Sequence, residues 1–275
     1  MTSTGDSSLL LWLVSAIVAL LASHVFVAWV RRSQGLLGFK ALVGPVILAG
    51  SALGLGFTSS MVLALSAEAL SFSLGSMWLA VPALVAGPAL ACVPVAWWLS
   101  RRHNWFSLLA CAALLTAVAI ALQVGWIMAA GMRPGVRWIF PLLGAAVGVQ
   151  LLGFGAALWL AYSDASGDGA RKTLWRAGGA ALMALTVVAG EEVTISAAGL
   201  LSQVGAIYQR QAAAAWLCLV AGAIVPIGLA MLSLDIWLRN RAERPRRRSS
   251  SLGVSPDASL NSPPRRKRRR KYRTL

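Results

Sequence analysis

Two adjacent glutamates are the clearest candidates for chemistry in this sequence. Glu191 and Glu192 lie in an otherwise apolar stretch from Ala177 to Leu200. Carboxylates inside an apolar helix are costly, and they usually face a cavity, a partner or a proton path. Because adjacent helix positions are about 100° apart, we expect one carboxylate to face inward and the other to face the outer headgroup level. A helix that ends close to the pair would explain it without any function.

The other polar residues do not form an enzyme site. The two histidines, His24 and His103, are far apart in the sequence, and the three cysteines lie in apolar runs without metal-ligand spacing. The sequence contains no HExxH or CxxC motif, and no cluster of nucleophile, base and metal ligands. We therefore expect a protein without enzymatic activity.

Long apolar stretches must position the glutamates. The 275 residues are 58% hydrophobic and 12% charged, with a mean hydropathy of +0.71, whereas a soluble domain has about 25% charged residues. A helix needs about 20 apolar residues to cross a bilayer. Seven stretches are long enough: Leu9–Val30, Ala41–Leu65, Met77–Leu99, Phe106–Met132, Ile139–Tyr162, Ala177–Leu200 and Ala213–Leu238. We predict an all-α polytopic membrane protein with seven transmembrane helices in a domain of residues 1–238.

The distribution of Lys and Arg predicts the orientation of these helices, because cytoplasmic loops carry an excess of basic residues. The loops after the first, third and fifth stretches and the region after the seventh contain 22 Lys and Arg residues in total. The opposite side contains 3, namely Arg133, Arg137 and Arg210. We therefore expect the N-terminus outside and the C-terminus in the cytoplasm.

Basic pairs recur along the chain at intervals of 70 residues. They are Arg31-Arg32, Arg101-Arg102 and Arg171-Lys172. This spacing predicts three helix-hairpin repeats followed by one further helix. Any even series of hairpins with basic inner loops would also produce spaced basic pairs.

Three sequence windows support the predicted repeat, because each contains a short polar or Met-bearing cluster between small residues. They span residues 54–65, 119–130 and 184–198. This pattern resembles the MHYT domain family, membrane sensors in which a Gly/Ala-rich stretch runs into Met-His-Tyr-Thr-Gly-Met-Ala-Ala three times over. In the third window Thr194 falls on the Thr of that motif, and Glu191 and Glu192 replace its Met and His.

The first two windows match the same motif at fewer positions. Ser60 and Met61 fall on its Met-His positions in the first window, and Gln123 and Val124 do so in the second. Met128 falls on the second Met of the motif, in Met-Ala-Ala. All three His positions are therefore substituted.

The resemblance implies a copper site built from Met and His, because copper favours thioether and imidazole ligands. Here it leaves Met61 and Met128 as candidate sulfur ligands, with Glu191, Glu192 and Thr194 as candidate oxygen groups. Several converging sulfurs are needed for such a site, whereas carboxylate oxygens suit protons or hard cations. We therefore expect no copper cofactor and a sensing function linked to protons.

Residues 239–275 form a strongly basic region, with 14 Lys and Arg against 2 Asp and Glu. A Ser/Pro-rich spacer without apolar periodicity separates its two clusters, so we predict a disordered cytoplasmic tail. Anionic lipid of the inner leaflet attracts such residues by about 1 kcal/mol each. We expect the tail to bind this lipid rather than nucleic acid, through Arg246, Arg247, Arg248, Arg265, Arg266, Lys267, Arg268, Arg269, Arg270 and Lys271.

The sequence thus favours an integral membrane sensor or signalling module in the plasma membrane. Since residues 239–275 are too few for a catalytic domain, it would act through a signalling protein partner. The alternative is a small transporter or channel that uses Glu191 or Glu192, in which prolines such as Pro88, Pro94 and Pro226 break the helices of its path.

Overall fold

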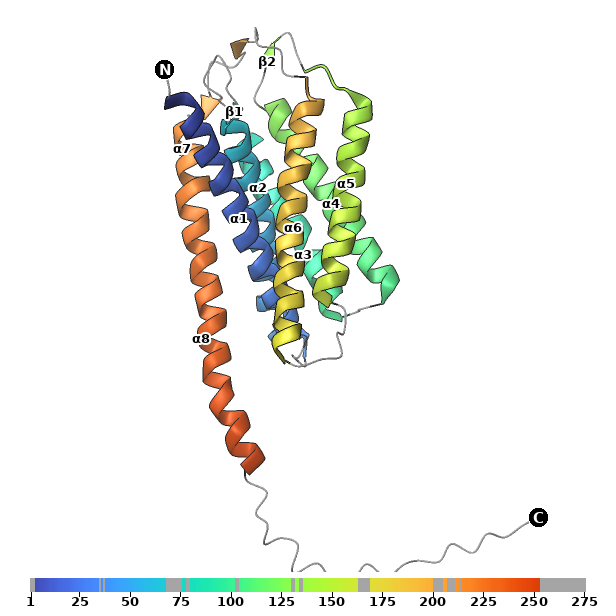
Figure 1. The fold of residues 1–275 in the computed structure, drawn as a ribbon, viewed down its shortest axis with the longest axis vertical. Coiled ribbons are helices and arrows are strands. Elements are labelled where there is room, and N and C mark those ends of the chain that lie inside the picture. Colours follow the sequence, from blue (N-terminus) through green and yellow to red (C-terminus); the bar gives the residue numbers. More distant parts are fainter. Residues whose placement is uncertain are drawn as a thin grey trace, which may run out of the picture. The chain divides into compact units, whose positions relative to one another are not determined.

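The structure is a computed structural model that describes residues 3–34, 36, 38–67, 76–77, 80–101, 104–129, 132–133, 136–162, 169–199, 205–206, 211–212 and 214–252. Apart from four strands of two residues each, the described elements are helices (Figure 1). The helices are α1 (Ser3–Ser33), α2 (Phe39–Ala67), α3 (Ala80–Arg101), α4 (Trp105–Ala129), α5 (Phe140–Tyr162), α6 (Gly169–Ala197), α7 (Ala214–Leu219), the π-helix η1 (Val220–Ile224) and α8 (Val225–Leu252). The all-α fold is confirmed, and seven helical segments are long and apolar enough to cross a membrane.

Several helix ends differ from the predicted ones because short strands and a glycine interrupt the apolar runs. Residues Ser76–Met77 form strand β1 instead of beginning the third helix, and Met132–Arg133 form strand β2 beyond the end of α4. The sixth helix ends at Ala197, before the predicted Leu200. Gly199 follows in a left-handed conformation (φ +49°) that glycine adopts without strain.

The seventh span is not one regular α-helix. It begins as α7, passes through the π-helical turn η1 and continues as α8. The backbone N–H of Val225 donates to the carbonyl of Val220, five residues earlier. The next residue is Pro226, which has no N–H to donate to a carbonyl four residues back. The expected interruption near Pro226 is therefore a π-bulge, whereas α3 runs continuously through Pro88 and Pro94.

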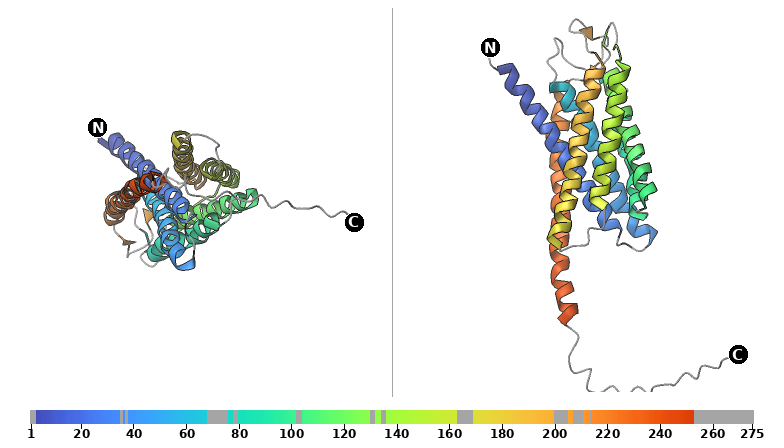
Figure 2. Two further views of the ribbon diagram at one scale, coloured as in Figure 1. Left: turned by 90° about the horizontal axis from the view of Figure 1, so that it is seen from below. Right: turned by 45° about the vertical axis from the view of Figure 1, so that its right-hand side comes forward.

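The helices α1–α6 run side by side in one bundle (Figures 1 and 2). Strand β1 pairs with β4 (Gln211–Ala212), and β2 pairs with β3 (Gly205–Ala206). These antiparallel pairs join the α2–α3, α4–α5 and α6–α7 connections, at the end of the bundle where the N-terminus lies (Figure 1). We call this end the strand end. The opposite end holds Arg31, Arg32, Lys40, Arg101, Arg171 and Arg176, and we call it the basic end.

Helix α2 is the most buried of the seven spans and packs against both α1 and α3. A Cβ atom at Gly54 would lie 2.4 Å from the backbone of Pro88 and Ala89 in α3. A Cβ atom at Gly56 would lie 2.1 Å from the Cβ of Ala22 in α1. Small residues thus let α2 approach both neighbours, as is common between membrane helices. By contrast, a Cβ atom at Gly87 or Gly144 would meet nothing within 4 Å, so these two glycines do not mark close helix contacts.

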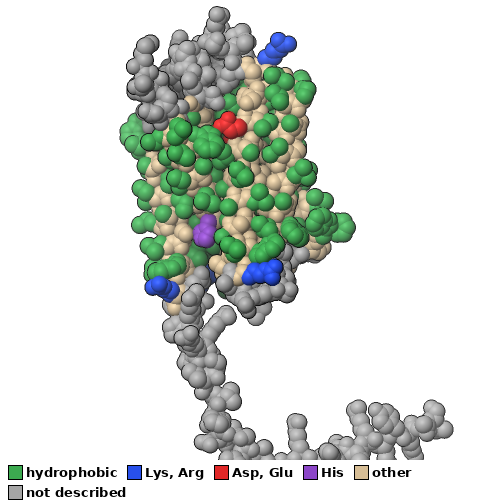
Figure 3. Space-filling model, in the orientation of Figure 1, with side chains coloured by type: hydrophobic (Ala, Val, Ile, Leu, Met, Phe, Trp, Pro, Cys, Tyr) green, Lys and Arg blue, Asp and Glu red, His purple; other side chains and the backbone are tan. Residues whose placement is uncertain are grey.

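The flank of the bundle is apolar. On the face shown in Figure 3, most of the side chains on the flank are hydrophobic, with an acidic side chain and a histidine among them, and the described Lys and Arg side chains lie at its two ends. Large exposed apolar side chains occur on every span, including Leu90, Phe106, Leu152, Leu185 and Met231. An apolar flank with charged ends is the pattern of a protein embedded in a bilayer. The protein is therefore a membrane protein.

The chain divides into two compact units, Met1–Ser233 and Leu234–Leu275. Within the second unit α8 continues to Leu252, beyond the predicted helix end at Leu238. Arg239 forms an ion pair with Asp235 one turn back at 2.8 Å, and Arg241 lies over the ring of Trp237. Such contacts between residues one turn apart favour helix, which explains why the helix does not end with the apolar stretch.

Candidate functional site

Glu191 is the buried carboxyl group of the bundle. Its side chain lies in the strand-end half of α6 and is only 1% exposed. The hydroxyl of Ser60, on α2, donates a hydrogen bond of 2.9 Å to its Oε2 atom. The hydroxyl of Ser15, on α1, lies 2.8 Å from the Ser60 hydroxyl and 3.2 Å from the Ser60 carbonyl oxygen. A chain of hydroxyl groups thus connects α1 and α2 to one carboxyl on α6.

Glu192 has different surroundings from its neighbour. Its side chain is half-buried, and the indole Nε1 of Trp12 on α1 donates a hydrogen bond of 2.8 Å to its Oε1 atom. The two adjacent carboxylates therefore point in different directions, as the 100° spacing predicts. Trp12 itself is 40% exposed, so this pair lies at the edge of the bundle, whereas Glu191 lies inside it.

A second polar cluster connects α4, α5 and α6 at the next turn of α6. The Oε1 atom of Gln123 accepts hydrogen bonds of 2.8 Å from Nε2 of Gln150 and from the hydroxyl of Thr194. The Thr194 hydroxyl also lies 2.7 Å from the carbonyl oxygen of Gly190. All three polar side chains are buried. Gly190 makes room for this cluster, because a Cβ atom there would lie 2.1 Å from Nε2 of Gln150.

Each of the three repeated windows contributes one residue to these clusters, and the three residues occupy the same position in their windows. Ser60, Gln123 and Glu191 all fall on the first Met of the motif that the windows resemble, and all three are buried and hydrogen-bonded. The three His positions are not brought together. Met61 is wholly buried, Val124 lines a groove between α4 and α5, and Glu192 contacts Trp12.

The residues do not fit the copper site that the resemblance implies. Met61 is inaccessible in the core, whereas Met128 is 57% exposed on α4, so the two thioethers do not face a common space. Among the described residues, no group of three or more His, Cys, Asp or Glu side chains is placed to hold a metal ion. His24 is exposed on α1, and His103 lies outside the described residues.

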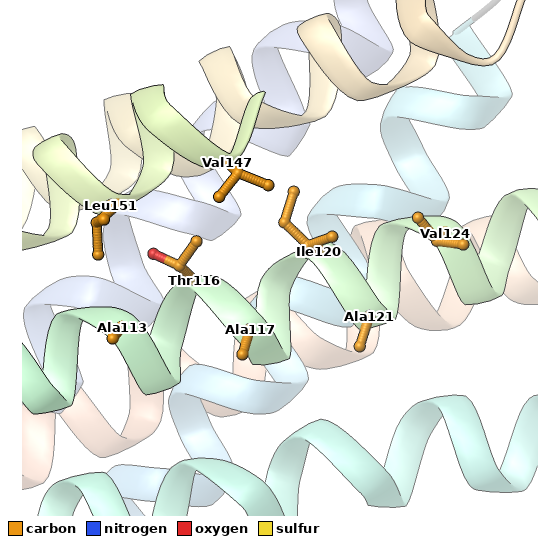
Figure 4. A pocket seen from close by; sticks show the side chains of 8 residues that line it. All are labelled: Ala113, Thr116, Ala117, Ile120, Ala121, Val124, Val147 and Leu151. Carbon is orange, nitrogen blue, oxygen red and sulfur yellow. The ribbon is translucent and has the colours of Figure 1, made fainter. Parts of the chain in front are cut away.

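An apolar groove between α4 and α5 is separate from both polar clusters (Figure 4). It has a volume of about 460 Å³, and its lining includes Ala117, Ile120 and Val124 from α4 and Val147 and Leu151 from α5. Its lining, as far as the structure describes the chain, includes no carboxylate and no residue of the Gln123 cluster. The groove is open to the flank, where its lining is suited to contact with lipid.

Glu191 has no ion-pair partner among the described residues. The hydroxyl of Ser60 is its hydrogen-bond donor. The ionisable group next to it is Glu192 on the same helix, whose negative charge would repel a negative charge on Glu191. The strand-end half of α1 has no charged residue from Leu9 onward. The strand-end halves of α2, α4 and α5 have none either. Among the residues that the structure describes, Glu191 is therefore bonded to a hydroxyl group and paired with no cation.

Sequence reasoning missed two members of these clusters, Ser15 and Gln150. Both are polar residues in largely apolar spans, a signal of the kind that identified Glu191. For the predicted lipid-binding residues, Arg246, Arg247 and Arg248 lie within α8, and Arg265–Lys271 lie outside the described residues. In comparisons with protein-family models, curated proteins and solved structures, the chain matches none of them.

Proposed function

We propose that this protein is a non-enzymatic, MHYT-like sensor or signalling module of the plasma membrane, in which Glu191 is the responsive group. The observation that carries the proposal is the burial of a carboxyl group whose one described hydrogen-bond donor comes from another repeat. Binding or release of a proton changes the charge of a carboxyl group. The hydrogen bonds that it makes with α2 therefore change too, and so does the packing of α6.

The signal would run from the outer side of the membrane to partners on the cytoplasmic side. The basic loops lie at the end of the bundle away from Glu191, so by the positive-inside rule we expect Glu191 near the outer surface and the C-terminus in the cytoplasm. A change at the strand end would reach a signalling protein partner through the helices. The basic tail would bind anionic lipid of the inner leaflet, and no nucleic acid or copper is part of the function.

Infrared spectroscopy of the protein in lipid nanodiscs tests the role of Glu191. We expect one component of the pH-induced change in the carboxylic acid C=O stretching band to be lost in Glu191→Gln, while the components of the other eight Asp and Glu residues remain. The matched control is Glu192→Gln, which removes the neighbouring carboxyl group and should retain that component. A pH-induced change of this band that is the same in Glu191→Gln as in the unaltered protein would contradict the proposal.

A transporter or channel is the alternative, and the π-bulge η1 in the seventh span favours it because such irregular turns often occur at functional sites. The continuous helix α3 gives it no support. Proton flux into liposomes that contain the protein distinguishes the two functions. We expect no flux above that of empty liposomes. A flux that Glu191→Gln abolishes would favour the transporter over the sensor.

A further inference from the structure

Two of the buried polar atoms that have no hydrogen-bond partner among the described residues belong to Gln150, a member of the Gln123 cluster, and to Trp126 on α4. One is the carbonyl oxygen Oε1 of Gln150, a wholly buried side chain on α5. The other is the indole Nε1 of Trp126, which is 2% exposed on α4. The first is an acceptor and the second is a donor. Inside a membrane protein an unpaired polar group is costly, so each atom requires a partner that is not a described side chain.

The hydrogen bonds of the Gln123 cluster explain why Gln150 keeps an unpaired acceptor. Its Nε2 atom donates to Oε1 of Gln123, and no described donor bonds to its own Oε1. Thr194 already donates to Gln123 and Gly190. Trp126 lies three residues after Gln123 on α4, which is about 4.5 Å further along the helix axis. Both unpaired atoms therefore belong to residues in or next to one cluster.

We propose that this cluster binds one small, neutral, hydroxylic molecule of the size of water. Its hydroxyl group would donate to Oε1 of Gln150 and accept from Nε1 of Trp126. The ligand is neutral because the hydrogen-bonding side chains here are amides, a hydroxyl and an indole. It is small because the cluster is tightly packed against Gly190. Buried water molecules typically bind such otherwise unpaired groups.

This binding site is separate from Glu191, whose carboxyl group bonds to Ser60 of α2. Its occupant would join α4 and α5 by a second hydrogen-bonded connection, beside the direct bond between Gln123 and Gln150. The proposal therefore does not depend on proton binding by Glu191.

Nuclear magnetic resonance of tryptophan-labelled protein in nanodiscs tests this site, with water as the probe. The indole N–H signal of Trp126 is identified as the one that is missing in Trp126→Phe. We expect a cross-peak between this proton and water. Its absence in the unaltered protein would overturn the proposal.

Variants determine whether Gln150 holds the water. Gly190→Ala places a Cβ atom against Gln150, and Gln150→Met removes the acceptor while keeping an unbranched side chain. Each should weaken the water cross-peak at least several-fold. The matched control is Gly148→Ala, whose Cβ would meet nothing within 4 Å, and it should retain the cross-peak. An equal cross-peak in all three variants would overturn the proposal. Glu191→Gln should retain it as well, and its loss there would overturn the separation of the two sites.

Discussion

At the scale of single residues, the buried carboxyl group of Glu191 depends on groups that come from other helices. Ser60 donates to it from α2, and Ser15 supports Ser60 from α1. A buried carboxyl group without such a donor would lose a hydrogen bond that water cannot replace. The hydroxyl chain is therefore what allows this residue type to occupy the core.

Replacement of Ser60 by alanine tests that dependence. We expect Ser60→Ala to lower the free energy of unfolding by about 1–3 kcal/mol, since it leaves a buried carboxyl oxygen without its donor. The control is Ser51→Ala on the same helix, because the Ser51 hydroxyl bonds only to backbone carbonyls of its own helix. Unfolding of the purified protein in micelles measures both. Equal stability of the two variants would show that the hydroxyl of Ser60 does not support Glu191.

At the scale of helices, the glycines of α2 decide how closely its neighbours pack. The contacts at Gly54 are with backbone atoms of α3, which cannot rotate away as a flexible side chain could. Added atoms in such a place force the two helices apart.

We expect Gly54→Ala to destabilise the protein by about 1–3 kcal/mol, the usual cost of overpacking. Gly87→Ala on α3 is the matched control, because its Cβ would meet nothing. The control should be neutral or more stable by up to about 1 kcal/mol, since alanine favours helix more than glycine does. Thermal unfolding in nanodiscs compares them. A Gly54→Ala protein as stable as the control would contradict the close packing of α2 and α3.

The seven spans could be predicted because a helix in a bilayer needs only sufficient length and apolar composition. The ends of α4 and α6 could not, since strand pairing between distant connections and the conformation of Gly199 determine them. The site was predicted only in part. Glu191 and Thr194 are polar residues in a largely apolar span, but the bond from Trp12 to Glu192 depends on α1 packing against α6, and the bond from Ser60 to Glu191 depends on α2 packing against α6. No periodicity in the sequence indicates which non-consecutive helices are neighbours.

At the scale of the whole molecule, the distribution of charge predicts how the protein lies in the membrane. We expect a reporter fused to the N-terminus to be active outside the cell and one fused to the C-terminus to be active in the cytoplasm. The reason is the asymmetry of 22 to 3 Lys and Arg residues between the two sides. A C-terminal reporter active only outside would reverse the orientation and would place Glu191 near the cytoplasm.

Removal of the basic region tests whether the bundle unit is stable without it. A chain that ends after Arg241 keeps the bundle unit and the ion pair between Asp235 and Arg239, but loses 12 of the 14 basic residues that follow Leu238. We expect its unfolding temperature in nanodiscs to equal that of the full chain, because the removed residues add no apolar face to the core.

The rate at which trypsin cleaves the basic region in the full chain measures how this region binds to lipid. We expect slow cleavage of residues 242–275 in nanodiscs of anionic lipid and fast cleavage in neutral ones, since anionic lipid attracts each basic residue by about 1 kcal/mol. Salt at about 1 M should remove the difference, because it screens charges beyond about 3 Å. Equal cleavage rates in the two lipids at low salt would contradict lipid binding. Loss of folded protein in the truncated chain would instead show that the basic region supports the bundle.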